Sequence, residues 1–151
     1  MDKHLQEAWQ ARQTSVSLKS PEEALTLASI VEKETGKGAD RPLISGVFNN
    51  RLRIGMRLQT DPTVIYGLGE AFDGNLRRGH LTSDTPWNTY TRAGLPPTPI
   101  AMPGKAALLA AVQPAKTQAL YFVAKGDGSS HFSASLEEHN RAVNRYQRGQ
   151  Q

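Results

Sequence analysis

The 151-residue sequence contains no cysteine, which excludes disulfide bonds and thiolate chemistry. It has no apolar run approaching the ~20 residues that a helix needs to cross a bilayer. Residues 1–20 also lack the apolar stretch of a secretory signal. We therefore expect the chain as given to be soluble. The absence of cysteine is compatible with a periplasm and equally with a bacterial cytosol.

Patterns for metal or phosphate binding are also scarce. No two of the four histidines stand at i, i+4 on a predicted helix, and no cysteine could join them as a zinc ligand. The stretch Gly36-Lys37-Gly38 lacks the spacing and the following Ser or Thr of a phosphate-binding loop. We expect no metal and no cofactor.

The composition that is present is typical of one folded domain, with 38% hydrophobic and 21% charged residues. The net charge of +4 favours a polyanion or an acidic surface as partner. Arg51, Arg53 and Arg57 form the densest basic run, which we interpret as a solvated face. A nucleic-acid partner is not expected, because such binders usually concentrate their charge in a stripe.

Hydrophobic spacing predicts an α+β fold that is helix-rich, with a small antiparallel hairpin and long loops lining a cleft. Residues 1–19 are predicted to be an N-terminal helix and linker, and residues 20–151 the main domain. Met56, Leu58 and Thr60 alternate as in a short strand, and Asp61-Pro62 marks a turn or a new helix. We expect helices at 2–14, 21–35, 41–54, 104–113 and 136–148, strands at 120–124 and 131–133, and an extended proline-rich run at 94–103.

The helix starts carry capping signals. Ser20 followed by Pro21 and Glu23 predicts an N-cap with a capping box, and Ser135 with Glu138 predicts a second box. Asp40 is predicted to cap the helix that Gly55 ends.

Glu34 stands out because it continues an apolar row. Leu27, Ile30 and Val31 occupy i, i+3 and i+4 of a helix face, and Glu34 is i+7. Burial there would raise the carboxyl pKa, as a general acid requires near neutral pH. The alternative is a solvated residue at a fraying helix end. Glu32 points about 200° away around the same helix.

Seven segments follow one another along the chain with the spacing of a known family, namely residues 28–35, 47–52, 56–66, 88–90, 94–97, 121–124 and 131–132. Together they closely resemble the endolytic murein transglycosylases, the MltG/YceG-like family. The likeness covers roughly residues 20–148.

The resemblance implies a lytic transglycosylase that cleaves the N-acetylmuramic acid–β-1,4–N-acetylglucosamine bond inside glycan strands of nascent peptidoglycan, leaving 1,6-anhydromuramic acid ends. It implies a catalytic glutamate in segment 32–35. Glu34-Thr35 is similar to the Glu-Ser pair at the helix end of lysozyme-like enzymes, so we expect Glu34, with Glu32 as the alternate.

Family members begin with a transmembrane anchor and carry a LysM-like domain. Neither is recognised here, so we expect an excised catalytic domain whose full-length protein acts at the periplasmic face of the inner membrane. The only membrane link expected is that missing anchor. The resemblance points to peptidoglycan glycan strands as substrate and to cell-wall synthases (penicillin-binding proteins) as partners.

Sugar binding requires planar hydrogen-bonding groups and aromatic faces. The candidates are Asn50, Gln59, Asp61, Tyr66, Asn88 and Tyr90. Asn50 could instead be a structural hydrogen-bonding residue, and Asp61 a cap or turn residue before Pro62. Tyr121 and Phe132, on the hairpin, are expected to be core residues.

Two rival functions remain open. If Asp61 faces Glu34, a hydrolytic muramidase with two carboxylates becomes an alternative. A non-catalytic module that binds cell wall or nucleic acid through its basic charge is the other.

Overall fold

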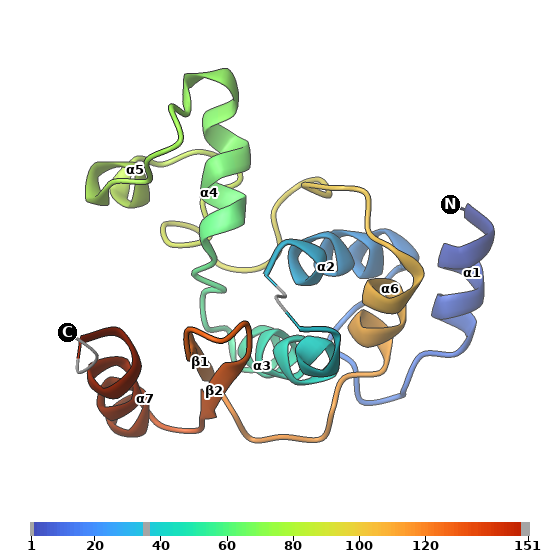
Figure 1. Ribbon diagram of the computed structural model, residues 1–151. Helices are drawn as coiled ribbons and strands as arrows, with labels where there is room; N and C mark the ends of the chain where they lie inside the picture. Colours follow the sequence, from blue (N-terminus) through green and yellow to red (C-terminus); the bar gives the residue numbers. More distant parts are fainter. Residues whose placement is uncertain (1, 35–36, 149–151) are drawn as a thin grey trace.

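The computed structural model describes residues 2–34 and 37–148 and confirms an α+β fold (Figure 1). Helices α1 (Asp2–Gln10), α2 (Pro21–Glu34), α3 (Arg41–Ile54) and α6 (Lys105–Val112) form the body. The remaining elements are η1 (Gly38–Asp40), α4 (Asp61–Leu68), η2 (Gly69–Ala71), α5 (Arg78–Thr82), β1 (Tyr121–Ala124), β2 (Ser130–Ser133), α7 (Leu136–Val143) and the π-helical turn η3 (Asn144–Arg148).

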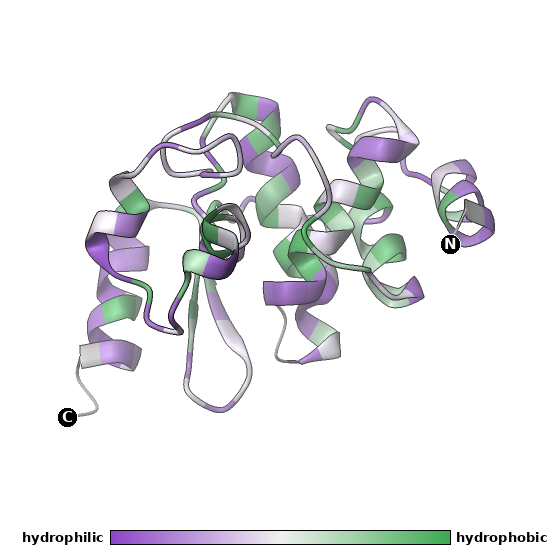
Figure 2. Ribbon diagram, turned by 90° about the horizontal axis from the view of Figure 1, so that it is seen from above, coloured by the Kyte–Doolittle hydropathy of each residue, from purple (hydrophilic) through white to green (hydrophobic). Residues whose placement is uncertain are grey.

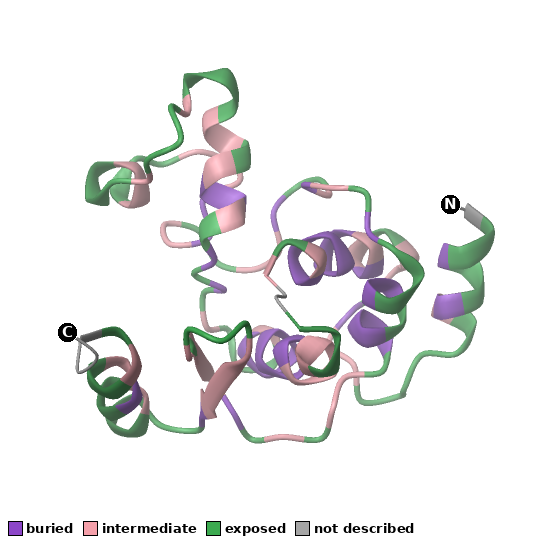
Figure 3. Cartoon of the chain, viewed as in Figure 1, coloured by how far each residue is buried: buried purple, intermediate pink, exposed green. Residues whose placement is uncertain are grey.

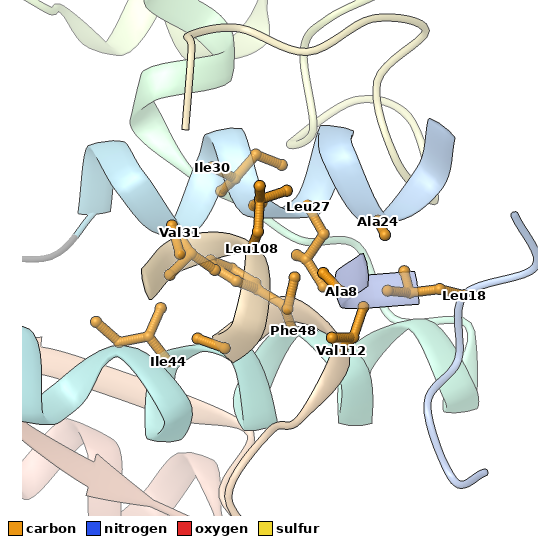
Figure 4. Close-up of a cluster of buried hydrophobic side chains, with 14 of the residues drawn as sticks. Ala8, Leu18, Ala24, Leu27, Ile30, Val31, Ile44, Phe48, Leu108 and Val112 are labelled. Carbon is orange, nitrogen blue, oxygen red and sulfur yellow. The ribbon is translucent and has the colours of Figure 1, made fainter. Parts of the chain in front are cut away.

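The core lies where α2, α3 and α6 meet, and buried residues concentrate on these three helices (Figure 3). Leu27 and Val31 of α2 are fully buried beside Phe48 of α3 and Leu108 of α6 (Figure 4). Burying one such side chain contributes roughly 1.5–3 kcal/mol. The apolar row that precedes Glu34 therefore faces the interior, and it fixes the end of α2 against the body.

Hydrophilic residues make up much of α7, which lies beside the C-terminus (Figure 2). None of the helices in the described ranges is long and apolar enough to cross a membrane.

The start of α2 follows the prediction in part. The Glu23 amide donates to Ser20 Oγ at 3.2 Å, which confirms the cap. The Glu23 carboxylate, however, accepts from the Lys19 amide at 2.9 Å, one residue before the cap. Only the first hydrogen bond of the predicted capping box therefore forms, because the Glu23 side chain bonds to the amide of Lys19 instead of the amide of Ser20. Thr35 and Gly36, the predicted helix end, lie outside the described residues.

The predicted side-chain cap by Asp40 is wrong. Its side chain makes no capping hydrogen bond to α3. Asp40 Oδ2 instead accepts from the Ser130 amide at 3.1 Å, because the hairpin lies against this end of α3. The end at Gly55 is confirmed, since Gly55 adopts a left-handed conformation (φ 75°) and its amide caps the helix.

The short strand predicted for residues 56–60 is also wrong. The only sheet within the described residues pairs β1 with β2. Leu58 and Thr60 are buried while Gln59 is exposed, which explains the alternation. The amides of Gln59 and Thr60 bond to Thr89, at 3.2 Å to its carbonyl and 3.0 Å to its hydroxyl, rather than to a strand.

Residues 61–92, here termed the lobe, extend from the body (Figure 1). Beyond the turn or helix start at Asp61-Pro62, no helix was predicted in these residues, but they include α4 and α5. The helix start at Asp61-Pro62 is confirmed. Thr63 and Thr89 join the two ends of the lobe by a 2.8 Å hydrogen bond between their hydroxyls. The lobe is therefore fastened at its base.

The proline-rich run 94–103 contains neither helix nor strand and lies against α2. The Ile100 amide donates to Ser29 Oγ at 3.0 Å, and the adjoining Gly104 amide donates to Glu32 Oε1 at 2.7 Å. These bonds attach the run to the middle and end of α2.

The hairpin is confirmed, with Phe122 opposite Phe132 and Tyr121 opposite Ser133. Phe122 packs edge-on against Phe48, with ring centroids 5.9 Å apart. Both Phe122 and Phe132 pack on the core. The Glu138 amide bonds to Ser135 Oγ at 3.2 Å, so the predicted N-cap of α7 forms.

Candidate active site

Glu34, the last described residue of α2, lines a cleft with a volume of about 370 Å³. This volume lies within the range of ligand sites in proteins. One wall comes from the body and the base of the lobe, and the other from β1 and α7. The lining residues are Glu34, Arg51, Leu58, Gln59, Asp61, Tyr90, Tyr121, Phe122, Leu136 and His139.

The Glu34 carboxyl is partly buried, and its pKa is raised from the ordinary 4.5 to about 7. Desolvation by burial is the largest cause, and the negative charge of Asp61 adds to it. The Thr60 hydroxyl and the Arg51 cation act in the opposite direction. The Thr60 hydroxyl is itself buried and has no well-aligned partner among the described residues. A carboxyl of this kind can release and accept a proton near neutral pH.

Asp61 and Tyr90 lie together at the base of the lobe. The Tyr90 hydroxyl donates to Asp61 Oδ1 at 2.5 Å. Burial and the Asp61 carboxylate raise the pKa of Tyr90, so its hydroxyl stays protonated and remains a donor. The structure therefore brings two predicted binding residues into the cleft beside Glu34.

Gln59 lies on the same wall, with an exposed side chain. Its φ of 51° makes it the only non-glycine residue with positive φ among the described residues. Strained backbone of this kind clusters at functional sites.

Arg51 was interpreted as part of a solvated face, and that interpretation is wrong. It is only 6% exposed. Its guanidinium donates to the carbonyls of Leu58 and Leu120, and it lies over the Tyr121 ring at 5.4 Å. Burial lowers the pKa of Arg51, and the nearby Glu34 is among the groups that offset this effect. The Arg51 side chain thus connects α3 to the segment around Leu58 and to β1, close to the Glu34 carboxyl.

The second wall was not predicted as a site. Tyr121 stacks on His139, with ring centroids 5.0 Å apart and an interplanar angle of 22°. Tyr121 was expected in the core, but it is only half-buried and lines the cleft. Leu136, the first residue of α7, is 56% exposed beside it.

Three other candidates for sugar binding do not line this cleft. Asn50 is buried, and its amide donates to the carbonyls of Thr117 and Ala119, both at 2.9 Å. This is the structural alternative considered for Asn50. Tyr66 is 46% exposed but packs edge-on to Trp87, 5.7 Å away.

Asn88 is 1% exposed. Its amide donates to Ser83 O at 2.8 Å and Leu81 O at 3.1 Å, while its carbonyl accepts from the Tyr90 amide at 2.8 Å. Asn88 is therefore buried within the turn that presents Tyr90.

Glu32, the alternate catalytic residue, also lies outside the cleft. Its carboxylate accepts the Gly104 amide. The two glutamates therefore differ in their surroundings, since Glu34 is partly buried in the cleft whereas Glu32 anchors the proline-rich run. That run does not line this cleft either, because its residues 94–97 border a separate hollow with Ser17, Lys19 and Thr26.

Over residues 2–34 and 37–148, no group of three or more His, Cys, Asp or Glu side chains is arranged to hold a metal ion.

Comparisons with known proteins show relatives of the chain. The YceG-like family matches residues 1–145. The chain is 48% identical over 122 residues to the endolytic murein transglycosylase of Bacillus subtilis (strain 168), covering 81% of this chain and 34% of that protein. It is 37% identical over 133 residues to the endolytic murein transglycosylase of Streptococcus pneumoniae serotype 2 (strain D39 / NCTC 7466), covering 80% of this chain and 23% of that protein.

Among solved structures, a YceG-like protein from Listeria monocytogenes superposes with a TM-score of 0.75 at 42% identity. The match covers 93% of this chain and 42% of that one. The chain thus spans about a third or less of the length of these curated relatives.

Proposed function

The chain belongs to the YceG-like family, and from that premise we propose that it is an endolytic lytic transglycosylase. It cleaves the N-acetylmuramic acid–β-1,4–N-acetylglucosamine bond within peptidoglycan strands and leaves 1,6-anhydromuramic acid ends. The observation that carries the proposal is the Glu34 carboxyl, whose pKa is raised to about 7 at the edge of an open cleft.

In the first step, protonated Glu34 donates its proton to the glycosidic oxygen as the bond breaks. A carboxyl with a pKa near 7 is protonated in a large fraction of molecules at neutral pH, and it is still acidic enough to give up its proton. Partial burial supplies this property, because it disfavours the charged form.

In the second step, the Glu34 carboxylate accepts the proton of the muramic acid 6-hydroxyl, which attacks C1 of the same sugar. One group can serve both steps because the nucleophile belongs to the substrate and needs no activated water. The bond formed is C1–O6, and the bond broken joins C1 to the leaving N-acetylglucosamine oxygen.

Asp61 is the second carboxylate of the cleft, and its charge acts on Glu34. In the proposed mechanism it steadies the positive charge that develops at C1 without forming a covalent bond. The same placement favours hydrolysis by a muramidase as the second candidate function, since ordinary glycosidases pair two carboxylates across the bond.

The relatives' names support murein as the substrate class. We propose that the full protein acts on nascent glycan at the periplasmic face of the inner membrane, alongside penicillin-binding synthases. A basic net charge of +4 is suited to the acidic surface that a cell wall presents.

Mass spectrometry of digested glycan strands tests the proposal. Anhydro ends, which are lighter than reducing ends by one water, are expected with the wild-type chain and absent with Glu34→Gln. Glu32→Gln is the matched control, because it changes the same residue type two positions away and outside the cleft. Reducing ends would favour the muramidase, and undiminished cleavage by Glu34→Gln would refute the assignment of Glu34.

A further inference from the structure

His139 is a polar group in the cleft that the proposed mechanism does not use. It belongs to α7, and the hairpin lies between that helix and α3 (Figure 1). Its ring stacks on Tyr121, and both side chains line the cleft with Glu34. The imidazole is therefore held in a fixed orientation by packing within the chain.

The two ring nitrogens of His139 differ in their surroundings. Nδ1 is buried and has no hydrogen-bond partner among the described residues. A buried N–H without an acceptor is rarer in proteins than an incompletely satisfied acceptor, so the tautomer with its proton on Nε2 is favoured. No hydrogen bond to Nε2 occurs within the described residues, and the ring is part-exposed to the cleft. Nε2–H is thus the donor that the ring can offer a ligand.

The charge of the ring matches this role. Burial lowers the pKa of His139, and the nearby Arg51 and His131 lower it further. The imidazole is therefore neutral near pH 7. A neutral donor suits an uncharged hydroxyl or acetamido oxygen, and its neutrality avoids repulsion with the cationic character that develops at C1.

The opposite wall supplies complementary groups. Gln59 offers an amide and Tyr90 an aromatic ring, both from residues around the lobe. Leu136 exposes an apolar side chain one helical turn before His139. Together they form a slot with hydrogen-bonding groups on both sides, as a sugar ring requires.

We propose that His139 is a substrate-contact residue, whose Nε2–H donates to a hydroxyl or acetamido oxygen of the sugar that lies between α7 and Gln59. The proposal rests on the proposed function for the identity of the substrate as a glycan. It adds the C-terminal helix to the binding machinery.

The test measures binding separately from cleavage. Peptide-free strands of alternating N-acetylglucosamine and N-acetylmuramic acid are titrated calorimetrically into the Glu34→Gln variant. The second variant adds His139→Phe, which keeps a flat ring against Tyr121 but removes both nitrogens. Loss of one hydrogen bond predicts about tenfold weaker binding. His139→Gln, which retains an N–H donor, is expected to recover part of the loss.

His131→Phe in the same background is the matched control. His131 lines a different hollow with Arg141 and Tyr146. The affinity of this control variant for the glycan strands should therefore stay within about twofold of that of the Glu34→Gln parent. Thermal unfolding verifies that all variants are folded. Equal affinity of His139→Phe and its parent would overturn the contact, as would an absence of glycan binding by the parent. If the contact holds but wild type leaves no anhydro ends, the proposed reaction fails and the contact remains.

Discussion

The Tyr90 hydroxyl donates a 2.5 Å hydrogen bond to Oδ1 of Asp61, 29 positions earlier in the chain. This bond closes the base of the lobe on the side of the cleft. The Asp61 carboxylate that it holds is also a cause of the raised pKa of Glu34. The proton affinity of the proposed catalytic group therefore depends on how the lobe is seated on the body.

Replacing Asp61 by asparagine should lower the pKa of Glu34, because it removes a negative charge that favours the protonated carboxyl. A general acid loses activity as pH rises through its pKa. The basic limb of the kcat/KM profile is thus expected at lower pH in Asp61→Asn than in wild type. Asp84→Asn is the control, since Asp84 is exposed and paired with Arg92 outside the cleft. An unmoved basic limb would contradict the coupling.

Arg51→Met should move the same limb in the opposite direction. The Arg51 cation lowers the pKa of Glu34, so its removal raises that pKa. The variant also leaves the Leu58 and Leu120 carbonyls without their donor, which should cost about 2–4 kcal/mol in urea unfolding. Arg57→Met, at an exposed position, is expected to change neither quantity. If the basic limb of the kcat/KM profile lay at the wild-type pH in a folded Arg51→Met variant, the cation would not act on Glu34.

The raised pKa of Glu34 predicts a pH-dependent stability. Between pH 4.5 and about 7 the folded chain holds a proton that the unfolded chain has released, so stability falls as pH rises through this window. Glu34→Gln removes the effect. It should match wild type near pH 4 and exceed it by about 2–3 kcal/mol near pH 8. Denaturant unfolding at both pH values measures this, and Glu32→Gln is expected to show no such divergence. A constant difference across pH would refute the burial of the Glu34 charge.

The sequence predicted the elements whose signals are local. The apolar row before Glu34 and the small antiparallel hairpin both appear in the structure. Arg51 was within reach of the same reasoning, because it follows Ile44, Val47 and Phe48 at i+7 on α3, as Glu34 follows its row on α2. This spacing puts Arg51 on the buried face of α3.

Other features depend on contacts between distant segments and carry no local signal. Asn50 bonds to backbone 67 and 69 positions away, so its residue type alone could not separate a sugar ligand from a structural amide. His139 reaches the cleft only because β1 places Tyr121 against α7. The alternation at 56–60 predicted a strand because burial alternates there, although the backbone partner is the lobe rather than a sheet.

Asn88→Ala should lower the free energy of unfolding, because Asn88 has a structural role and makes no direct contact with the substrate. The buried amide satisfies carbonyls of residues 81 and 83 and orders the turn before Tyr90. Leaving these groups unpaired is expected to cost about 2–4 kcal/mol. Urea unfolding measures the loss. Asn75→Ala, at an exposed position of the same lobe, should remain within about 0.5 kcal/mol of wild type. If Asn88→Ala left the stability unchanged but weakened glycan binding, the result would instead support the prediction that Asn88 contacts the sugar.

Gln59 allows backbone strain and side-chain function to be separated. Its left-handed φ of 51° costs a non-glycine residue roughly 1 kcal/mol, yet the position keeps an exposed amide in the cleft. Gln59→Gly relieves the strain but adds flexibility to the unfolded chain, so its stability should stay within about 0.5 kcal/mol of wild type. Gln59→Val introduces a β-branched residue that tolerates this conformation poorly, and it should lose at least about 1 kcal/mol.

Both Gln59 substitutions remove the amide, so both should raise KM for glycan strands although their stabilities differ. Unfolding curves and steady-state kinetics on the same three proteins provide the comparison. If KM followed stability, rising for valine and staying normal for glycine, the backbone rather than the amide would matter to the substrate. A raised KM in both variants would instead show that the chain keeps a strained residue at this position because its side chain contacts the sugar.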